Sequence, residues 1–186
     1  MQGDIDKVLI SRDRIAARIR ELAGQIERDF AALSELSSGE EIVLVPILTG
    51  SIIFVADLMR ELPHKVRINV VTVTSYPGKA TASKGAAIHG SLPDNHEIEG
   101  KHVLIVDDIL DSGSTLRLIR EEVLRRNPRS VRTCVLLRKT RPSALATPCE
   151  YVGFDIPDEF VVGYGLDYDN YYRNLPDIGT LKREAM

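Results

Sequence analysis

The strongest constraint on the fold comes from one stretch of the sequence, residues 103–116. Four apolar residues, three of them β-branched, lead into the acidic pair Asp107 and Asp108, which is typical of a strand buried on both faces that ends at a polar site. Residues 111–115 are rich in turn and N-cap types, and apolar side chains then recur at helical spacing, at Leu116, Ile119, Val123 and Leu124. The stretch therefore predicts a strand, an acidic turn and the start of a helix.

The composition of this turn suits an anion. Free backbone N–H groups at a helix N-terminus favour a phosphate, and Gly113 lets the backbone approach it closely. Further donors come from the hydroxyls of Ser112, Ser114 and Thr115. Because Asp107 and Asp108 would repel a phosphate, we expect them to bind hydroxyl groups or a metal ion. A phosphate beside a vicinal diol describes a ribose phosphate; the alternative is a loop whose carboxylates only cap and solvate the helix start.

The length of 186 residues fits one domain, and the 44% hydrophobic and 27% charged residues are those of a globular protein. A net charge of −3 gives no overall drive toward nucleic acid. Cys134 and Cys149 lack the spacing of a disulfide framework or a zinc knuckle, so a reducing cytoplasm fits best. The N-terminus lacks the apolar core of a signal peptide, and no apolar run reaches membrane-spanning length. We therefore expect a soluble, cytoplasmic protein.

Strand and helix patterns alternate along the chain. Ser11 is a plausible N-cap, and a long amphipathic helix is predicted from apolar residues at Ile15, Ile19, Leu22, Ile26 and Phe30. Residues 42–48 read as a buried strand, residues 49–51 as a turn, and residues 52–62 as a helix, which gives a second candidate anion site. Residues 66–75 and 131–137 read as further strands. This order predicts a Rossmann-like α/β domain with a mainly parallel sheet covered on both faces.

Residues 76–85 have little apolar content and are too long for a tight hairpin. They are a candidate lid over an active site, and the alternative is an ordinary flexible hairpin. They are not a phosphate-binding P-loop, because the full motif is absent. The dinucleotide-binding glycine motif is also absent after the strands, and the four histidines are read as surface residues.

The predicted helix that starts near Thr115 carries several arginines along its length and just after it. They include Arg117, Arg120, Arg125, Arg126 and Arg129. Glutamates lie between them, so a solvated face is favoured over contact with RNA or an acidic partner. A cationic run, residues 138–141, follows the strand at 131–137, where Lys139 could face a ligand or simply lie on the surface. Residues 151–154 and 160–167 interleave aromatic residues with glycine, which predicts short strands and tight turns.

Two motifs carry a family resemblance. Residues 103–116 resemble the phosphoribosyl pyrophosphate motif of type I phosphoribosyltransferases, and residues 158–168 resemble the purine-binding end of the hypoxanthine-guanine branch. With residues 49–51, 75–76 and Lys139, the resemblance covers nearly all the chain after the first helix. It implies a type I phosphoribosyltransferase fold: one domain over residues 1–186, with a small hood subdomain made of N-terminal residues and roughly residues 145–186.

The resemblance also implies how the donor substrate is held. Asp107 and Asp108 would bind the ribose hydroxyls, and the turn Asp111–Thr115, with Ser112, Gly113 and Ser114, would wrap the 5′-phosphate. Thr49 and Gly50 would hold pyrophosphate through backbone amides, often with a non-proline cis peptide, and Arg173 would contact it too. Asp167 would bind Mg²⁺, the expected cofactor; its alternative is a turn-capping role. Many relatives have Lys or Arg where this chain has Thr49, which removes a cation.

The remaining implied roles concern the purine and the lid. Asp111 would take the N7 proton as base or only hydrogen-bond N7. Lys139 would donate to the 6-oxo group, which favours hypoxanthine and guanine over adenine. Phe160 would stack on the ring, although a core aromatic is the alternative, and the Val161 backbone would meet the opposite edge. Ser75 and Tyr76 would begin the catalytic lid, whose alanine-rich residues 80–87 depart from the commoner pattern.

The expected function is purine salvage: transfer of the 5-phosphoribosyl group from phosphoribosyl pyrophosphate to hypoxanthine or guanine, giving IMP or GMP. We expect a homodimer or homotetramer with no nucleic-acid or membrane partner. An enzyme that prefers xanthine or accepts 6-oxopurines broadly is the alternative within the family. A phosphoribosyltransferase-like regulator that binds RNA is the alternative from another class, and the set Asp111, Lys139 and Asp167 argues against it.

Overall fold

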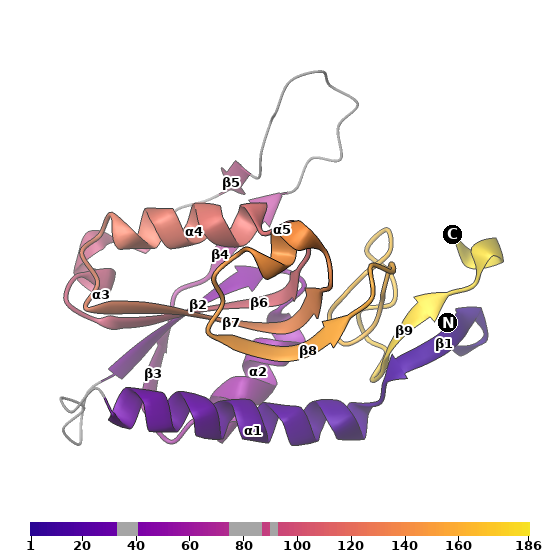
Figure 1. Cartoon of the computed structure of the whole chain (residues 1–186), viewed down its shortest axis with the longest axis horizontal. Helices are drawn as coiled ribbons and strands as arrows, with labels where there is room; N and C mark the ends of the chain where they lie inside the picture. The colour runs from indigo at the N-terminus through magenta and orange to yellow at the C-terminus, as the bar shows by residue number, and fades with distance from the viewer. Residues whose placement is uncertain (33–40, 75–86, 90–92) are drawn as a thin grey trace.

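The computed structural model describes residues 1–32, 41–74, 87–89 and 93–186 (Figure 1). Within these ranges one sheet has seven strands, in the order β5-β4-β2-β6-β7-β8 with β3 also paired to β2. Its strands are β2 (Glu41–Leu48), β3 (Lys65–Ile68), β4 (Val71–Thr74), β5 (Ala87–His89), β6 (His102–Leu110), β7 (Ser130–Lys139) and β8 (Tyr151–Ile156). All neighbours pair in parallel except β4 and β5. The predicted mainly parallel sheet is confirmed.

Helices cover both faces of this sheet. On one face lie α1 (Arg12–Ala31) and α2 (Ile52–Glu61), and on the other lie α3 (Asn95–Ile98) and α4 (Ser114–Leu124) (Figure 1). Alternate residues of β2 explain the layers, because Ile42 and Leu44 pack in the core with α1 and α2, whereas Val43 and Val45 pack with α4. Each fully buried side chain of this size contributes about 1.5–3 kcal/mol relative to exposure. The middle residues of β2 and β6, at 42–45 and 103–106, are therefore apolar on both faces.

The first helix follows its predicted pattern. The Ser11 hydroxyl accepts a hydrogen bond from the Arg14 backbone N–H at 3.5 Å and so caps α1. The predicted apolar stripe is buried, and Ala23 joins it. This stripe packs α1 across the sheet and against α2.

Three local predictions were wrong. Residues 66–75 do not form one strand: β3 and β4 pair in turn with β2, and between them the Asn69 backbone N–H donates to the Leu44 carbonyl at 2.9 Å. The strand at 103–106 does not end at the acidic pair, because its ladder with the long strand β7 continues to Leu110. His102 is not a surface residue: it is buried, packs edge-on against Phe30, and its Nδ1 lies 2.7 Å from the Ser130 hydroxyl.

A second, two-stranded sheet joins the two ends of the chain. Strand β1 (Ile5–Ile10) pairs antiparallel with β9 (Ile178–Leu181), and both termini lie beside it (Figure 1). The segment between β8 and β9 packs on this pair through Val162 and Leu175, which share a buried cluster with Leu181 of β9. The remaining elements are the short helix α5 (Pro142–Leu145) and the 3₁₀ turns η1 (Gln2–Asp4) and η2 (Arg183–Ala185). Among the helices described, none is long and apolar enough to cross a membrane.

Candidate active site

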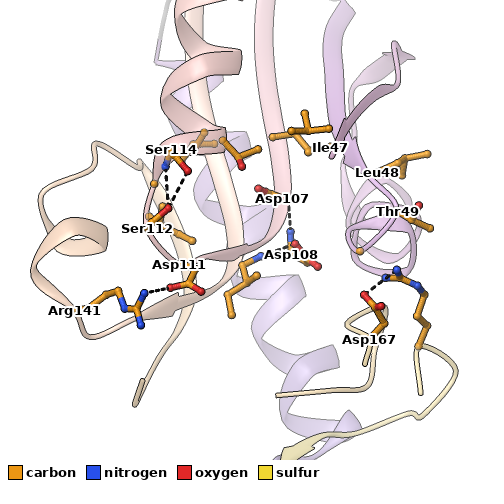
Figure 2. Close-up of a pocket in the computed structure, with 18 residues that line it drawn as sticks. Ile47, Leu48, Thr49, Asp107, Asp108, Asp111, Ser112, Ser114, Arg141 and Asp167 are labelled. Carbon is orange, nitrogen blue, oxygen red and sulfur yellow. Dashed lines mark hydrogen bonds and ion pairs between the residues drawn. The ribbon is translucent and has the colours of Figure 1, made fainter. Parts of the chain in front are cut away.

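A cavity of about 510 Å³ opens at the carboxyl ends of β2 and β6 (Figure 2). Ligands of open parallel sheets bind at this position, outside the strand ends. The cavity brings together residues from five separate parts of the described chain: 47–50, Val73, 107–116, Arg141, and Asp167 with Arg173. Most of the residues predicted for a ribose phosphate site therefore line one space.

The turn before α4 leads into a helix N-terminus, where the Ser114 backbone N–H donates to the Ser112 hydroxyl at 3.4 Å. Gly113 is the N-cap of α4 with a positive φ of 80°, and it has no side chain to cap the helix. A Cβ atom there would lie 2.0 Å from the Thr147 hydroxyl oxygen, so only glycine fits. The Ser112 and Ser114 hydroxyl oxygens lie 2.9 Å apart, and both residues line the cavity together with Thr115 (Figure 2). The residues predicted to bind an anion therefore lie at a helix N-terminus that faces the cavity.

The acidic pair lies inside β6 at the base of the cavity. Asp107 is buried, and its Oδ1 accepts from the Asp108 backbone N–H at 3.0 Å. The Oδ1 atom of Asp108 accepts from the Ile109 N–H at 2.8 Å. Burial raises the pKa of both carboxyls, and the charge of Asp108 raises that of Asp107 further. A ligand that donates hydrogen bonds to these oxygens would stabilise their charged forms.

The loop after β2 is held by close backbone packing. The peptide bond between Leu48 and Thr49 is cis, as the resemblance implies. A Cβ atom on Gly50 would lie 1.7 Å from Oδ2 of Asp108, and one on Gly165 would lie 2.1 Å from the Gly50 carbonyl oxygen. The buried Ser51 hydroxyl donates to the Ile47 carbonyl at 2.6 Å. The loop is thus fixed between β6 and the turn at residues 163–165, with the Thr49 side chain exposed.

Asp167 and Arg173 form the wall of the cavity opposite α4. The Oδ1 atom of Asp167 lies 2.8 Å from Nη2 of Arg173 (Figure 2). Nη1 of Arg173 donates to the Gly165 carbonyl at 2.7 Å. The other Asp167 oxygen accepts from the Asn170 N–H at 2.9 Å. Tyr164 anchors the same turn by donating to Asp57 of α2. The two predicted residues are brought together, and Asp167 also has the turn-capping contact of its alternative reading.

Asp111 faces two cations. Its Oδ1 lies 2.6 Å from Nη1 of Arg141 (Figure 2). Its Oδ2 lies 3.2 Å from Nζ of the buried Lys139. Lys139 is not among the described residues that line the cavity. It contacts Asp111, which does line the cavity. The sequence prediction omitted Arg141, whose only signal was its place in the cationic run 138–141.

Phe160 and Val161 lie outside the described lining of the cavity. Phe160 is 51% exposed and meets Tyr168 edge-on, with ring centroids 5.7 Å apart, whereas Val161 is buried. The core alternative for Phe160 is therefore wrong. Ser75, Tyr76 and the predicted lid at residues 76–85 lie outside the described residues.

Comparison with known proteins places this geometry in a family. A family model for the phosphoribosyl transferase domain matches residues 10–169. The hypoxanthine-guanine phosphoribosyltransferase of Mycobacterium tuberculosis is 47% identical over 182 residues, which cover 96% of this chain and 87% of that protein. The chain belongs to the hypoxanthine-guanine phosphoribosyltransferase family. The predicted family, fold, enzyme class and purine-salvage function are confirmed.

Solved structures of this family agree with the fold. A Bacillus anthracis hypoxanthine-guanine phosphoribosyltransferase superposes with a TM-score of 0.81 at 39% identity, covering 96% of this chain and 98% of the other. A Trypanosoma cruzi hypoxanthine phosphoribosyltransferase in complex with the product IMP gives 0.86 at 37% identity, covering 98% and 97%. The alignments thus extend over nearly the whole of each chain, and the folds agree.

Proposed function

We propose that this chain transfers the 5-phosphoribosyl group from phosphoribosyl pyrophosphate to hypoxanthine or guanine, releasing pyrophosphate and giving IMP or GMP. One observation carries the proposal: a single cavity is lined by the α4 turn, the acidic pair and the loop 48–50 with Arg173. Phosphoribosyl pyrophosphate needs hydrogen-bond donors at its 5′-phosphate and at its pyrophosphate, with acceptors for its ribose hydroxyls between them, and this order of groups supplies both. The relatives carry names that match this reaction.

The donor substrate would lie along the cavity. Backbone N–H groups of Ser114 and Thr115, with the nearby hydroxyls, would bind the 5′-phosphate. Asp107 and Asp108 would accept hydrogen bonds from the ribose hydroxyls. The backbone of Thr49 and Gly50, and the guanidinium of Arg173, would hold pyrophosphate. Thr49 provides no charged side chain, so Arg173 supplies cationic charge at this end.

The residues present also suit Mg²⁺. Asp167 places a half-buried carboxylate on the cavity wall, and among the described residues no three His, Cys, Asp or Glu side chains group as a metal site. A single carboxylate suits Mg²⁺, which usually takes its other ligands from water and substrate phosphates. We propose Asp167 as the residue that would hold it. The chemistry supplied with Mg²⁺ is neutralisation of charge on the departing pyrophosphate.

The purine would be bound next to Asp111. We propose that Asp111 accepts the N7 proton, or a hydrogen bond from N7, while Lys139 donates to the 6-oxo group. Their 3.2 Å contact fits this assignment, because N7 and the 6-oxo oxygen are neighbours on one edge of the purine. Phe160 has an exposed ring free to stack, and the Val161 backbone would meet the far edge. Ser75 and Tyr76 are proposed to begin the lid that excludes water.

We further propose a cytoplasmic homodimer or homotetramer whose domain spans residues 1–186. The hood would comprise β1 and the chain after β8, because β8 itself lies in the large sheet. Exposed apolar side chains at Ile52, Ile68 and Val70 favour self-association. The free thiols of Cys134 and Cys149 suit a reducing compartment. A nucleic-acid partner is not favoured, since Arg120 and Arg125 already pair with glutamates of this chain.

A parallel turnover assay tests the function. Purified chain is incubated with phosphoribosyl pyrophosphate, Mg²⁺ and one of hypoxanthine, guanine, xanthine or adenine, and nucleotide formation is followed. Turnover of hypoxanthine and guanine is expected, with adenine poor because its 6-amino group is a donor. Preference for xanthine would move the assignment to the alternative specificity. Failure with every base, by folded protein, would reject the enzymatic function.

A further inference from the structure

A second cation touches the carboxylate proposed as the base. Arg141 is the residue before α5, and its Nη1 lies 2.6 Å from Oδ1 of Asp111. Its other edge contacts Asp158, with Nε donating to Oδ2 at 3.1 Å and Nη2 to the same oxygen. Arg141 lines the cavity, unlike Lys139. The roles proposed above leave this residue without a function.

Lys139 and Arg141 bridge the same two carboxylates. Nζ of Lys139 lies 3.2 Å from Oδ2 of Asp111 and 3.3 Å from Oδ1 of Asp158. The four side chains therefore form a closed ring of alternating charge in which each oxygen of Asp111 has its own cation: Arg141 at Oδ1 and Lys139 at Oδ2. The ring joins the acidic turn to the segment that leads into Phe160.

Binding of a purine would break this ring on one side. When Lys139 donates to the 6-oxo group, Asp111 Oδ2 loses part of its contact and becomes the oxygen available to N7. The Arg141 guanidinium stays 2.6 Å from Oδ1 as an ion pair without an aligned hydrogen bond, and this attraction limits rotation of the carboxylate. The side chains of Arg141, Asp111 and Asp158 are 35%, 45% and 47% exposed, so their ion pairs add little to the stability of the fold. The contact of Arg141 with Asp111 matters instead for the orientation of the carboxylate.

We propose that Arg141 is a positioning residue for proton transfer from the purine: it holds Asp111 by Oδ1 so that Oδ2 faces N7. The proposal rests on the proposed function. It assigns Arg141 an effect on turnover through Asp111, with little effect on the binding of phosphoribosyl pyrophosphate. A carboxylate displaced by about 1 Å can lose roughly 100-fold in rate, so the effect is measurable.

The test is a double-mutant cycle on kcat with hypoxanthine. Arg141→Ala is expected to lower kcat by roughly 10- to 100-fold, to leave KM for phosphoribosyl pyrophosphate within about twofold, and to be partly rescued by Arg141→Lys. In an Asp111→Asn background the same change is expected to have almost no further effect, because the residue acts through Asp111. The matched control is Arg138→Ala, which removes a two-point contact between β7 and Asp155 of the neighbouring strand β8, outside the cavity lining.

Each outcome decides the proposal. Unchanged kcat in Arg141→Ala, or an equal loss with and without Asp111, would overturn the positioning role while leaving the proposed function intact. A loss in Arg138→Ala as large as in Arg141→Ala would also overturn it. If Arg141→Ala does not fold, Arg141→Gln takes its place in the same cycle. No turnover by the unaltered chain would reject the proposed function itself.

Discussion

Nζ of Lys139 lies 3.2 Å from Oδ2 of Asp111, so the two groups proposed to read one edge of the purine already face each other. An incoming 6-oxopurine offers a donor at N7 beside an acceptor at the 6-oxo position. It can therefore replace the ion pair by two hydrogen bonds without moving either residue far. Adenine offers a donor at position 6, which would leave the Lys139 ammonium without an acceptor.

Replacing Asp111 by asparagine tests the proton acceptor. Asp111→Asn keeps the side-chain shape but removes the basic oxygen, so kcat with hypoxanthine is expected to fall about 10²- to 10⁴-fold. Binding of phosphoribosyl pyrophosphate, measured by calorimetry, is expected to change little because the 5′-phosphate contacts are backbone N–H groups. An unchanged kcat would rule out Asp111 as the base.

Replacing Lys139 by alanine tests recognition of the 6-oxo group. Lys139→Ala is expected to raise KM for hypoxanthine and guanine by roughly 10- to 100-fold, the range for losing a hydrogen bond from a charged donor. The control is Lys101→Ala. It removes an ion pair in which Nζ of Lys101 lies 2.9 Å from Oε1 of Glu41, and neither residue is among the described residues that line the cavity. Equal kinetics for Lys139→Ala and the unaltered chain would show that another residue reads the purine.

Gly50→Ala tests the close packing of the pyrophosphate loop. The added Cβ would lie 1.7 Å from Oδ2 of Asp108, so the Asp108 side chain must move and affinity for phosphoribosyl pyrophosphate should drop. Gly24→Ala is the control. It lies within α1, where the nearest atom to the new Cβ is Arg28 Nη1 at 3.4 Å, and should stabilise the fold by about 0.5–1 kcal/mol. Wild-type affinity in Gly50→Ala would contradict the assigned role of the loop.

Asp107→Asn is predicted to stabilise the fold while weakening substrate binding. Burial, and then the charge of Asp108, raises the pKa of Asp107 well above its usual value. The folded state thus holds this proton more tightly than the unfolded state, and the charged carboxylate lowers the free energy of unfolding as pH rises above about 4. Asparagine removes this penalty and still accepts from the Asp108 N–H.

The measurement is the difference in Tm between Asp107→Asn and the unaltered chain at pH 4 and pH 7. The stabilising difference should be larger at pH 7, and each 1 kcal/mol corresponds to about 2–4 °C for a chain of this size. Using the difference between the two proteins cancels the opposite effect of Asp155 and Asp158, whose pKa values their arginine partners lower. A difference that shrinks between pH 4 and pH 7 would contradict the prediction.

The sequence predicted what local pattern controls. The helical spacing from Ile15 to Phe30 and the turn around Gly113 depend on neighbours along the chain, and both are confirmed. Contacts between distant segments were not predictable: Asp108 approaches Gly50, and Arg141 joins Asp111 to Asp158, only because the sheet order places these segments together. The break between β3 and β4 has the same origin, since its register depends on β2.

The pairing of β1 with β9 has a consequence for synthesis of the protein. Ile5 lies opposite Leu181, and the Arg12 backbone N–H donates to Asp177 at 2.7 Å, so β1 gains its partner only after residue 181 has been synthesised. A nascent chain that already contains the large sheet still exposes β1 as an unpaired edge, which other strands can join. Arg173 lies just before β9, so the cavity wall that contains Arg173 and the partner strand of β1 are synthesised at nearly the same stage.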